Sequence, residues 1–526
     1  MSSKTCRARA TEMDPKKVLY NYCDVLTTTP HAPNTKVLVT GANGYVAQRL
    51  IPELVHRGYF VRCMLRTKNT PFLLDHPRIE VVYADCLVKE QLKPVLEDIE
   101  IAYYLIHSMR AKRSEFADMD KMMAQNFVEE AEEAGIKKII YLGGLGETNV
   151  LLSTHLQSRM EVGEILSNSS IPVIRLLAAI IIGTGSTSYE LLKSLVIHNR
   201  WIPFMAEFNN LCQCIAIRDV IKYLVGIMEY RSNVSRVYHI GGKDVFAYRD
   251  VILSFAKIAK RDIRFFDVFW VPLPISMSCR IFACWLHLFT SLPVNIISLL
   301  LNSLKSDVVC LNNDIRNILP FEPLSFEIAV KRALERERKS QVFSHWSDVP
   351  PDTMRDLLPL YEYESASFVV EEHSIDIPAN SNIIFQSITQ IGGKHGWLQG
   401  NFLWRIRGFI DRLFGGIGLQ RGRRDPDQLR EGDSLDFWRV EKLEPNKELL
   451  LRGELISPGL SWLQFLLDPG TNRSTKLTLK AHFIPNPFWG QIYWFLMSKF
   501  HTYIFKGMLA HFRQTATEKN HKVIKS

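Results

Sequence analysis

The segment Thr35–Ala47 constrains the fold more than any other part of the chain. Its apolar run Val37–Val39 has the length and composition of a buried parallel strand. Gly41, Gly44 and Ala47 follow at three-residue spacing, and a helical pattern starts at once. A strand, a glycine turn and a helix in this order bind the pyrophosphate of a dinucleotide on backbone N–H groups at the helix N-terminus.

The turn between this strand and helix supplies the groups that are expected to touch the cofactor. Gly41 permits the tight bend, Gly44 lets the backbone approach the phosphates, and the small Ala47 lets the helix lie close to the sheet. The alternative is an ordinary strand–helix turn with structural glycines, and the strands that follow disfavour it. The predicted cofactor-binding residues of the turn are Gly41, Asn43, Gly44, Tyr45 and Val46.

Apolar runs recur after the turn, separated by helical stretches. Strands are predicted at 59–65, 79–83, 99–107, 138–142, 173–182 and 237–242. Strands that alternate with helices form a parallel sheet with helices on both faces. The sequence therefore predicts an α/β domain of the Rossmann type, a doubly wound parallel sheet. A small helical substrate lobe, apolar and aromatic, is predicted between 248 and 340.

The residues after the second strand bear on the choice between NAD(H) and NADP(H). An acidic residue there would accept a hydrogen bond from the 2′-hydroxyl of NAD, whereas this chain has Arg66 and Lys68 and no carboxylate. A guanidinium such as that of Arg66 is suited to pair a 2′-phosphate. NADP(H) is therefore favoured over NAD(H), and the alternative is a solvated basic turn.

Three further polar residues follow the third and fourth strands, at the sheet edge where ligands bind. Asp85 is placed to reach the adenine edge or, alternatively, to cap the helix that follows. His107 and Ser108 end the fourth strand, where His107 either faces the cofactor or caps the strand end. We include all three among the predicted cofactor-binding residues.

Length and charge limit the classes of protein to which the chain belongs. With 526 residues, two or three domains are expected. The 64 Lys and Arg residues exceed the 55 Asp and Glu residues by nine. This surplus suits an anionic cofactor or an acidic membrane surface and does not require nucleic acid, so no nucleic-acid partner is expected.

Cysteine and apolar patterns bear on metal binding and location. The nine cysteines are scattered, and the spacing of Cys212 and Cys214 matches no zinc pattern, so no metal site is predicted. Met1–Pro15 is polar without a secretory core, and no run of about 20 apolar residues occurs. A cytoplasmic protein is expected. The apolar segments 269–304 and 488–508 are expected to cover a core as amphipathic helices or, alternatively, to contact the inner face of a membrane.

Several motifs together resemble an atypical or extended short-chain dehydrogenase/reductase over about residues 34–345. They are Thr40–Ala47, Ala84-Asp85, His107-Ser108 and Arg175–Gly185. More narrowly, four phrases resemble a bacterial group that fuses such an NAD(P)-binding domain to a C-terminal domain of unknown function, DUF2867. They are His155–Arg159, Ile182–Ser188, Gln390–Gly393 and Gly400–Trp404. More distantly, the first domain is similar to the NADPH-binding accessory subunit of respiratory complex I, which binds the cofactor without reported turnover.

The resemblance implies a catalytic helix on which a Tyr and, four residues later, a Lys act together. Here His155 stands in the Tyr position and Arg159 in the Lys position, and Gly143–Gly144 replaces the helper serine. A histidine still serves as a general acid because its ordinary pKa lies near neutrality. Arg159 is suited to bind a ribose or a phosphate, but it does not give up its proton. Ordinary hydride chemistry and its loss both stay open.

From about residue 366 the pattern changes to a run of strands. A strand at 367–377 precedes helices at 381–390 and 401–414, and four strand-like runs lead to a long aromatic helix at 487–512. This order indicates an α+β domain of the START-like, helix-grip type, which often holds an apolar ligand. The basic loop 415–424 either meets an anionic headgroup or phosphate or is solvated. The predicted divisions are an N-terminal extension at 1–33, the NAD(P)-binding domain with its lobe at 34–345, a linker at 346–365, the DUF2867 domain at 366–515 and a basic tail at 516–526.

Three functions are compatible with this organisation. The first is an NAD(P)(H)-dependent oxidoreductase or isomerase that acts on an apolar, quinone- or lipid-like substrate. The second is a non-catalytic NADPH-binding redox sensor or complex-assembly factor. The third is a carrier of a lipid or quinone that works through the second domain. All three functions stay open from the sequence, and so does the oligomeric state.

Overall fold

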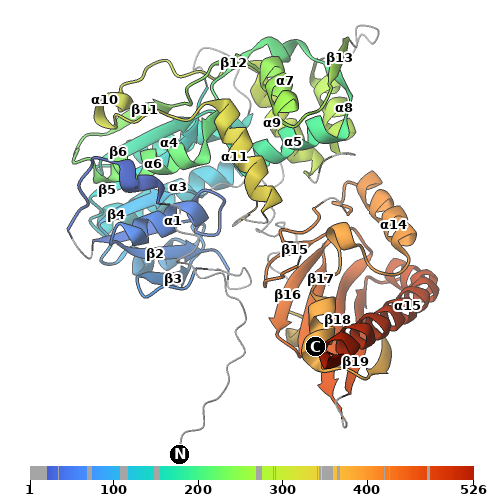
Figure 1. The fold of residues 1–526 in the computed structure, drawn as a ribbon. Coiled ribbons are helices and arrows are strands. Elements are labelled where there is room, and N and C mark those ends of the chain that lie inside the picture. The colour runs from blue at the N-terminus through green and yellow to red at the C-terminus, as the bar shows by residue number, and fades with distance from the viewer. Residues whose placement is uncertain are drawn as a thin grey trace, which may run out of the picture. The chain divides into compact units, whose positions relative to one another are not determined.

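A computed structural model describes most of the chain and divides it into two compact units. The described residues are 21–32, 35–67, 74–106, 116–146, 154–267, 275–287, 290, 292–339, 342, 345, 359–363, 368–419, 421–425, 427–470 and 474–525. One unit spans Leu19–Arg355, and the other contains Asp356–Ser526 (Figure 1). Most of the predicted linker at 346–365 lies outside the described residues.

A seven-stranded sheet forms the centre of the first unit, with the strand order β11-β6-β5-β4-β1-β2-β3. Its strands are β1 (Lys36–Thr40), β2 (Phe60–Leu65), β3 (Ile79–Tyr83), β4 (Ile101–Tyr104), β5 (Lys138–Gly144), β6 (Val173–Ala178) and β11 (Arg236–Ile240). All neighbouring strands run parallel. Val37, Leu38 and Val39 are fully buried because helices cover both faces of the sheet (Figure 1). The predicted doubly wound α/β fold is confirmed.

The order of the strands sets the position of a ligand crevice. The chain runs from β1 through β2 to β3, then returns to place β4 on the other side of β1. Ligands of such sheets bind outside the carboxyl ends of the strands at this reversal. The covering helices are α1 (Ala47–His56), α2 (Lys93–Leu96), α3 (Phe116–Glu133), α4 (Thr154–Ser167) and α6 (Ile217–Glu229), with the short helix η3 (Lys89–Gln91).

The remainder of the first unit is a mainly helical lobe with its own apolar core. Buried aromatic and aliphatic side chains such as Tyr189, Phe255, Leu286 and Ile297 pack there. Its helices are α5 (Thr187–His198), α7 (Tyr248–Ile258), α8 (Ile275–His287), α9 (Val294–Asn302), α10 (Ile315–Ile318) and α11 (Phe326–Arg338). Paired short strands are β7 (Ile181–Ile182) with β10 (Ile215–Ala216), β9 (Leu211–Cys212) with β12 (Phe246–Ala247), and β8 (Trp201–Phe204) with β13 (Arg264–Asp267). Three single turns of helix are η2 (Tyr22–Val25), η4 (Ala206–Asn209) and η5 (Ser303–Lys305).

The second unit is a six-stranded antiparallel sheet with a long helix packed on it. The strand order is β14-β19-β18-β17-β16-β15. The strands are β14 (Val369–Ile377), β15 (Ser434–Leu435), β16 (Trp438–Glu444), β17 (Glu448–Gly453), β18 (Gly459–Pro469) and β19 (Thr475–Pro485). The helices are α13 (Ser381–Ile388), α14 (Asn401–Leu413), α15 (Trp489–Lys525), η7 (Leu360–Glu362) and η9 (Gly393–His395).

Alternating side chains of the central strands build the core beneath α15. Phe465 and Leu479 on the sheet and Phe505 and Phe512 on α15 belong to one buried cluster. The outward alternation of polar residues along β19 is the pattern of a strand with one buried face. A curved sheet that holds a long helix is the predicted α+β, helix-grip arrangement.

Candidate cofactor site

Two glycines shape the turn between β1 and α1. Gly41 has a φ of +60°, a left-handed conformation that favours glycine. A Cβ atom at Gly41 would lie 3.2 Å from the backbone oxygen of Leu105, which follows β4. A Cβ atom at Gly44 would lie 3.0 Å from the oxygen of Gly41, whose carbonyl already accepts from the N–H of Gly44 over 2.8 Å. The turn therefore has space for backbone approach only because both side chains are absent.

The N-terminus of α1 opens directly from this turn. Its N-cap residue, Val46, makes no side-chain capping hydrogen bond, and its side chain has no acceptor. The first N–H groups of a helix have no intrahelical acceptors and carry partial positive charge. In α1 the N–H groups of Gln48 and Arg49 already donate to the carbonyls of Gly44 and Val46 over 3.0 and 3.1 Å. An anion at the turn would still meet the partial positive charge of the helix N-terminus, so the residues present fit the pyrophosphate of a dinucleotide.

Two polar side chains that the sequence reasoning missed hold this turn in place. Arg49 is buried and donates from Nη1 to the carbonyl of Tyr45 over 3.1 Å and from Nη2 to that of Thr184 over 2.8 Å. Thr40 donates from Oγ1 to the carbonyl of Tyr103 and accepts from the N–H of Leu105, each over 3.0 Å. The signal for Arg49 is a lone arginine among the apolar residues of α1.

Arg66 and Asp85, predicted separately, form an ion pair. The Nε atom of Arg66 donates to Oδ2 of Asp85 over 2.8 Å, and the two side chains are 41% and 21% exposed at the sheet edge. Oδ1 of Asp85 also accepts from the N–H of Leu87 over 3.0 Å. Asp85 thus stabilises the turn after β3, whereas the N-cap residue of the next helix, η3, is Val88 and not Asp85. Lys68, His107 and Ser108 lie outside the described residues.

The guanidinium of Arg159, on α4, lies beside the carboxyl end of β5. Its Nη2 donates to the carbonyl of Leu142, and its backbone carbonyl accepts from the hydroxyl of Tyr141 over 2.9 Å. Burial raises the pKa of Tyr141, which keeps that hydroxyl protonated and able to donate. His155 belongs to the first turn of α4, but its side chain is not among those described.

The position of the helper serine is closed by neighbouring leucines. A Cβ atom at Gly143 would lie 2.7 Å from Cδ2 of Leu177, and one at Gly144 would lie 2.8 Å from Cδ2 of Leu156. A side chain at either glycine would have to displace these leucines. The two glycines offer no hydroxyl at the end of β5, and a side chain at either position would require the end of a leucine side chain to move.

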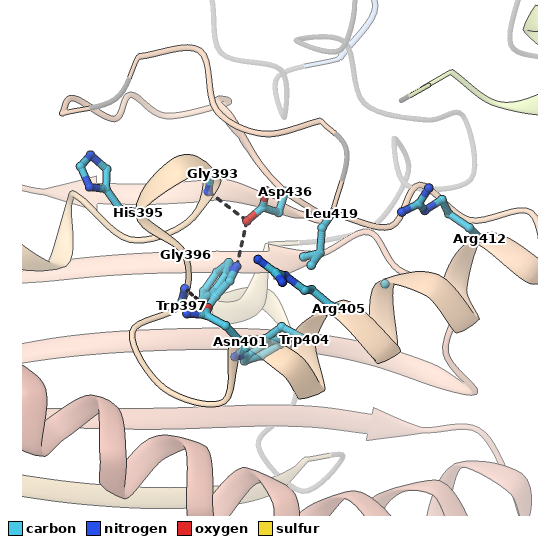
Figure 2. A pocket seen from close by; sticks show the side chains of 11 residues that line it. Gly393, His395, Gly396, Trp397, Asn401, Trp404, Arg405, Arg412, Leu419 and Asp436 are labelled. Carbon is cyan, nitrogen blue, oxygen red and sulfur yellow. Dashed lines mark hydrogen bonds between the residues drawn. The ribbon is translucent and has the colours of Figure 1, made fainter. Parts of the chain in front are cut away.

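Two cavities among the described residues belong to the second unit. One, of about 320 Å³, is lined by residues that include His395, Trp397, Arg405 and Asp436 (Figure 2). Trp397 donates from Nε1 to Oδ2 of Asp436 over 2.8 Å, and the N–H of Gly393 donates to the same oxygen over 3.1 Å. Burial raises the pKa of Asp436. These bonds occupy the one buried carboxylate among the residues that line this cavity.

The second cavity of this unit, of about 190 Å³, lies between the sheet and the helices α14 and α15. Tryptophan, phenylalanine and aliphatic side chains make up most of its wall, including Trp438, Trp462, Phe483, Trp494 and Met497. Such a wall suits an apolar ligand.

The structure corrects the prediction for the basic loop 415–424. The side chains of Arg421 and Arg424 are almost completely buried and pair with Glu454 and Asp433. Arg423 donates to the backbone carbonyls of Ile391 and Thr389 over 2.8 and 2.9 Å. The sequence could not show this because the carboxylates come from other segments. These arginines are therefore neither solvated nor open to an external anion.

Comparison with protein families matches a part of each unit. Residues 41–168 match a family described as NAD(P)H-binding, and residues 365–508 match a protein family of unknown function, DUF2867. The chain joins an NAD(P)H-binding domain to a DUF2867 domain. The match of the NAD(P)H-binding family begins at Gly41, so the glycine turn belongs to that domain and the predicted dinucleotide partner is confirmed at this level.

Individual relatives are similar only over parts of their length. Sterol demethylase protein B of Methylococcus capsulatus is 26% identical over 116 residues, which cover 22% of this chain and 35% of that protein. Protein BRI1-5 ENHANCED 1 of Arabidopsis thaliana is 34% identical over 89 residues, 15% of this chain and 24% of its own. The chain thus matches about a third of the length of the first relative and about a quarter of the length of the second. A solved UDP-glucose 4-epimerase of Thermotoga maritima aligns over 58% of this chain and 100% of its own with 13% identity and a TM-score of 0.45, which is too low to carry an argument.

Membrane-spanning helices and metal centres are both absent from the described residues. No helix in the described part of the chain has the length and apolar character needed to cross a membrane. Among the same residues, no group of three or more His, Cys, Asp or Glu side chains is arranged to hold a metal ion.

Proposed function

We propose that the protein is an NADP(H)-dependent oxidoreductase or isomerase that acts on an apolar, quinone- or lipid-like substrate. The observation that carries the cofactor part is the glycine turn at the N-terminus of α1, where Gly41 and Gly44 leave room for phosphates. When bound, the nicotinamide supplies or accepts a hydride. The buried side chains of the substrate lobe are mainly apolar and aromatic, and this composition is the ground for proposing a substrate with little charge.

Arg66 is the proposed partner of the 2′-phosphate. It follows β2, where an NAD-specific domain would carry a carboxylate. Its present partner, Asp85, already holds it at the carboxyl edge of the sheet. If a phosphate replaces Asp85, the guanidinium of Arg66 remains paired with an anion. The replacement therefore adds no desolvation cost for the guanidinium.

His155 and Arg159 are the proposed catalytic residues, by their positions on α4. His155 would supply or take the proton at the substrate oxygen, since an imidazole does so near neutral pH. Arg159 would orient the substrate or the ribose as a fixed cation. The hydrogen bond from Arg159 to the carbonyl of Leu142 supports a positioning role, because it holds the guanidinium beside the end of β5.

The test is a fluorescence titration of the full chain with NADPH and NADH, followed by NADPH oxidation assays with menadione and decylubiquinone. We expect the wild type to bind NADPH more tightly than NADH. We expect Arg66→Ala to weaken the binding of NADPH by about 10- to 100-fold, which corresponds to one or two charge-assisted hydrogen bonds. Arg62→Ala is the matched control because Arg62 pairs with Glu80 over 2.8 Å elsewhere on β2. Equal affinities for both nucleotides would reject the assignment of Arg66.

A non-catalytic NADPH-binding role is the second candidate. It is favoured by Gly143 and Gly144, which carry no hydroxyl at the position of the helper serine at the end of β5. Tight NADPH binding with no oxidation by either quinone would support this candidate over the enzyme. A His155→Ala variant that keeps full turnover would remove His155 from the mechanism.

A further inference from the structure

The helix α14 leaves most of its apolar side chains exposed and buries one, Trp404, in the core of its own domain. Phe402, Ile406, Phe409 and Leu413 repeat at helical spacing and are all exposed, Phe402 at 72%. The residues of α14 that are buried toward its own domain are Trp404, Gly408 and Asp411. A surface helix normally turns its apolar stripe to the core. Within its own unit, nothing described covers this stripe.

The first turns of α15 repeat this arrangement. Trp489, Phe495 and Leu496 are exposed, with Phe495 at 71%, whereas Ile504 and Phe505 are buried against the sheet. The helix is therefore apolar on both its inner and its outer side. A helix that is apolar all round is suited to apolar surroundings on both sides.

The two exposed stripes adjoin. Nε of Arg407 on α14 donates to the hydroxyl of Tyr493 on α15 over 3.4 Å, and the two helices lie next to each other in Figure 1. Ile406 and Phe500 are exposed and also line the apolar cavity of about 190 Å³. We call the exposed side chains of α14 and of residues 489–503 the α14–α15 face. Three of its residues, Ile406, Ile410 and Phe500, also line that cavity.

The exposed charges within the α14–α15 face have one sign. Arg405 and Lys499 are exposed within it. The only acidic residue of α14, Asp411, is buried and accepts from the N–H groups of Gly418 and Ile456 over 2.8 and 2.6 Å. In α15, no acidic residue precedes Glu518. Apolar and aromatic side chains interspersed with cations complement an anionic lipid surface.

We propose that the α14–α15 face docks on an anionic lipid bilayer and brings the apolar cavity to the membrane. The aromatic side chains would lie at the headgroup level, where amphipathic rings are favoured. Arg405 and Lys499 would contact anionic headgroups. The alternative occupants are a second copy of the chain and another protein. Nothing in the described structure links either of them to the cations of this face. The proposal does not depend on the cofactor assignment, because every residue it uses belongs to the second unit.

The test is flotation of the full chain with vesicles of phosphatidylcholine alone and of phosphatidylcholine with phosphatidylglycerol. We expect binding to the anionic vesicles, with at least about tenfold weaker binding for Phe409→Asp and Phe495→Asp, because each removes a large apolar contact. Leu311→Asp is the control, since Leu311 is 71% exposed in the first unit. The role of the cations is tested with the double variant Arg405→Glu/Lys499→Glu. Its binding to the anionic vesicles is compared with that of the control Lys476→Glu, which alters an exposed lysine on β19.

The outcomes separate the possible occupants. Binding to anionic vesicles that survives Phe409→Asp and Phe495→Asp overturns the proposal, as does equal binding to both vesicle types. A wild-type dimer that the same variants convert to monomer assigns the face to a second copy and also overturns it. Unchanged far-ultraviolet circular dichroism verifies that each variant is folded, which is expected because the altered side chains are exposed.

Discussion

Arg66 donates a hydrogen bond from Nε to Oδ2 of Asp85 over 2.8 Å, and this pair joins the ends of β2 and β3 at the predicted ribose position. Both residues were predicted to bind the cofactor, yet each is here the partner of the other. Asp85 is therefore expected to compete with a 2′-phosphate for the guanidinium of Arg66.

Asp85→Asn should raise the affinity for NADPH several-fold and leave that for NADH unchanged. The side-chain amide oxygen that this substitution introduces still accepts from the N–H of Leu87, so the turn is kept, while the competing negative charge is lost. Fluorescence titration with both nucleotides measures the two affinities. An equal loss for NADPH and NADH would instead indicate that Asp85 contacts the part of the cofactor that they share.

Gly44→Val should abolish NADPH binding, with a loss of at least about 100-fold, equal to about 2.7 kcal/mol. A Cβ atom 3.0 Å from the oxygen of Gly41 forces the turn to move and closes the approach to the phosphates. Isothermal titration calorimetry measures the loss. The control is Gly135→Asn at the end of α3, where φ is +72° and nothing lies within 4 Å. Asparagine tolerates this conformation. Retained affinity in Gly44→Val would contradict the site.

Glu454→Gln should lower the free energy of unfolding of the second unit by about 3–5 kcal/mol, because it leaves buried cations without their counter-charge. The side chain of Glu454 is fully buried, and Arg439 donates to its Oε2 from Nη2 over 3.1 Å. These guanidinium groups keep the pKa of Glu454 far below its usual range despite its burial. Urea unfolding followed by tryptophan fluorescence measures the change. Glu444→Gln, which removes a solvent-exposed partner of Lys447, should change the free energy of unfolding far less, because exposed ion pairs contribute little to stability.

His482 should make the second unit less stable as the pH falls from 6.5 toward 4. Burial and the charge of Lys480 lower the pKa of His482 to about 4. The unfolded chain, with an ordinary imidazole pKa near 6.5, therefore binds a proton in this window that the folded chain does not. The urea midpoint should fall between pH 7 and pH 4.5 by less in His482→Gln than in the wild type. Parallel pH profiles for both proteins would refute the contribution of His482.

The glycine turn illustrates what local sequence is able to predict. A strand, two glycines and a helix lie within about a dozen residues, so their chemistry depends on neighbours along the chain. The parallel sheet follows from the same alternation, because parallel strands need crossover helices. The side-chain partners were not predicted, because Arg49 reaches Thr184 from 135 residues away. The same limit explains the wrong expectation for Arg421, whose partner Glu454 comes from another segment.

By itself, the sequence determined the two classes of domain and the dinucleotide-binding turn, because periodicity and glycine spacing act over short stretches of chain. Only the tertiary structure decided which charges are paired and which apolar stripes stay uncovered. Arg66 and Arg421 both lie in basic turns of the sequence. In the folded protein, Arg66 stays at the edge of the sheet, whereas Arg421 is buried against the carboxylate of Glu454. The α14 stripe has a core-like pattern along the chain, and only packing shows that it faces outward. Burial and pairing depend on contacts between segments that are distant in sequence, so no local pattern encodes them.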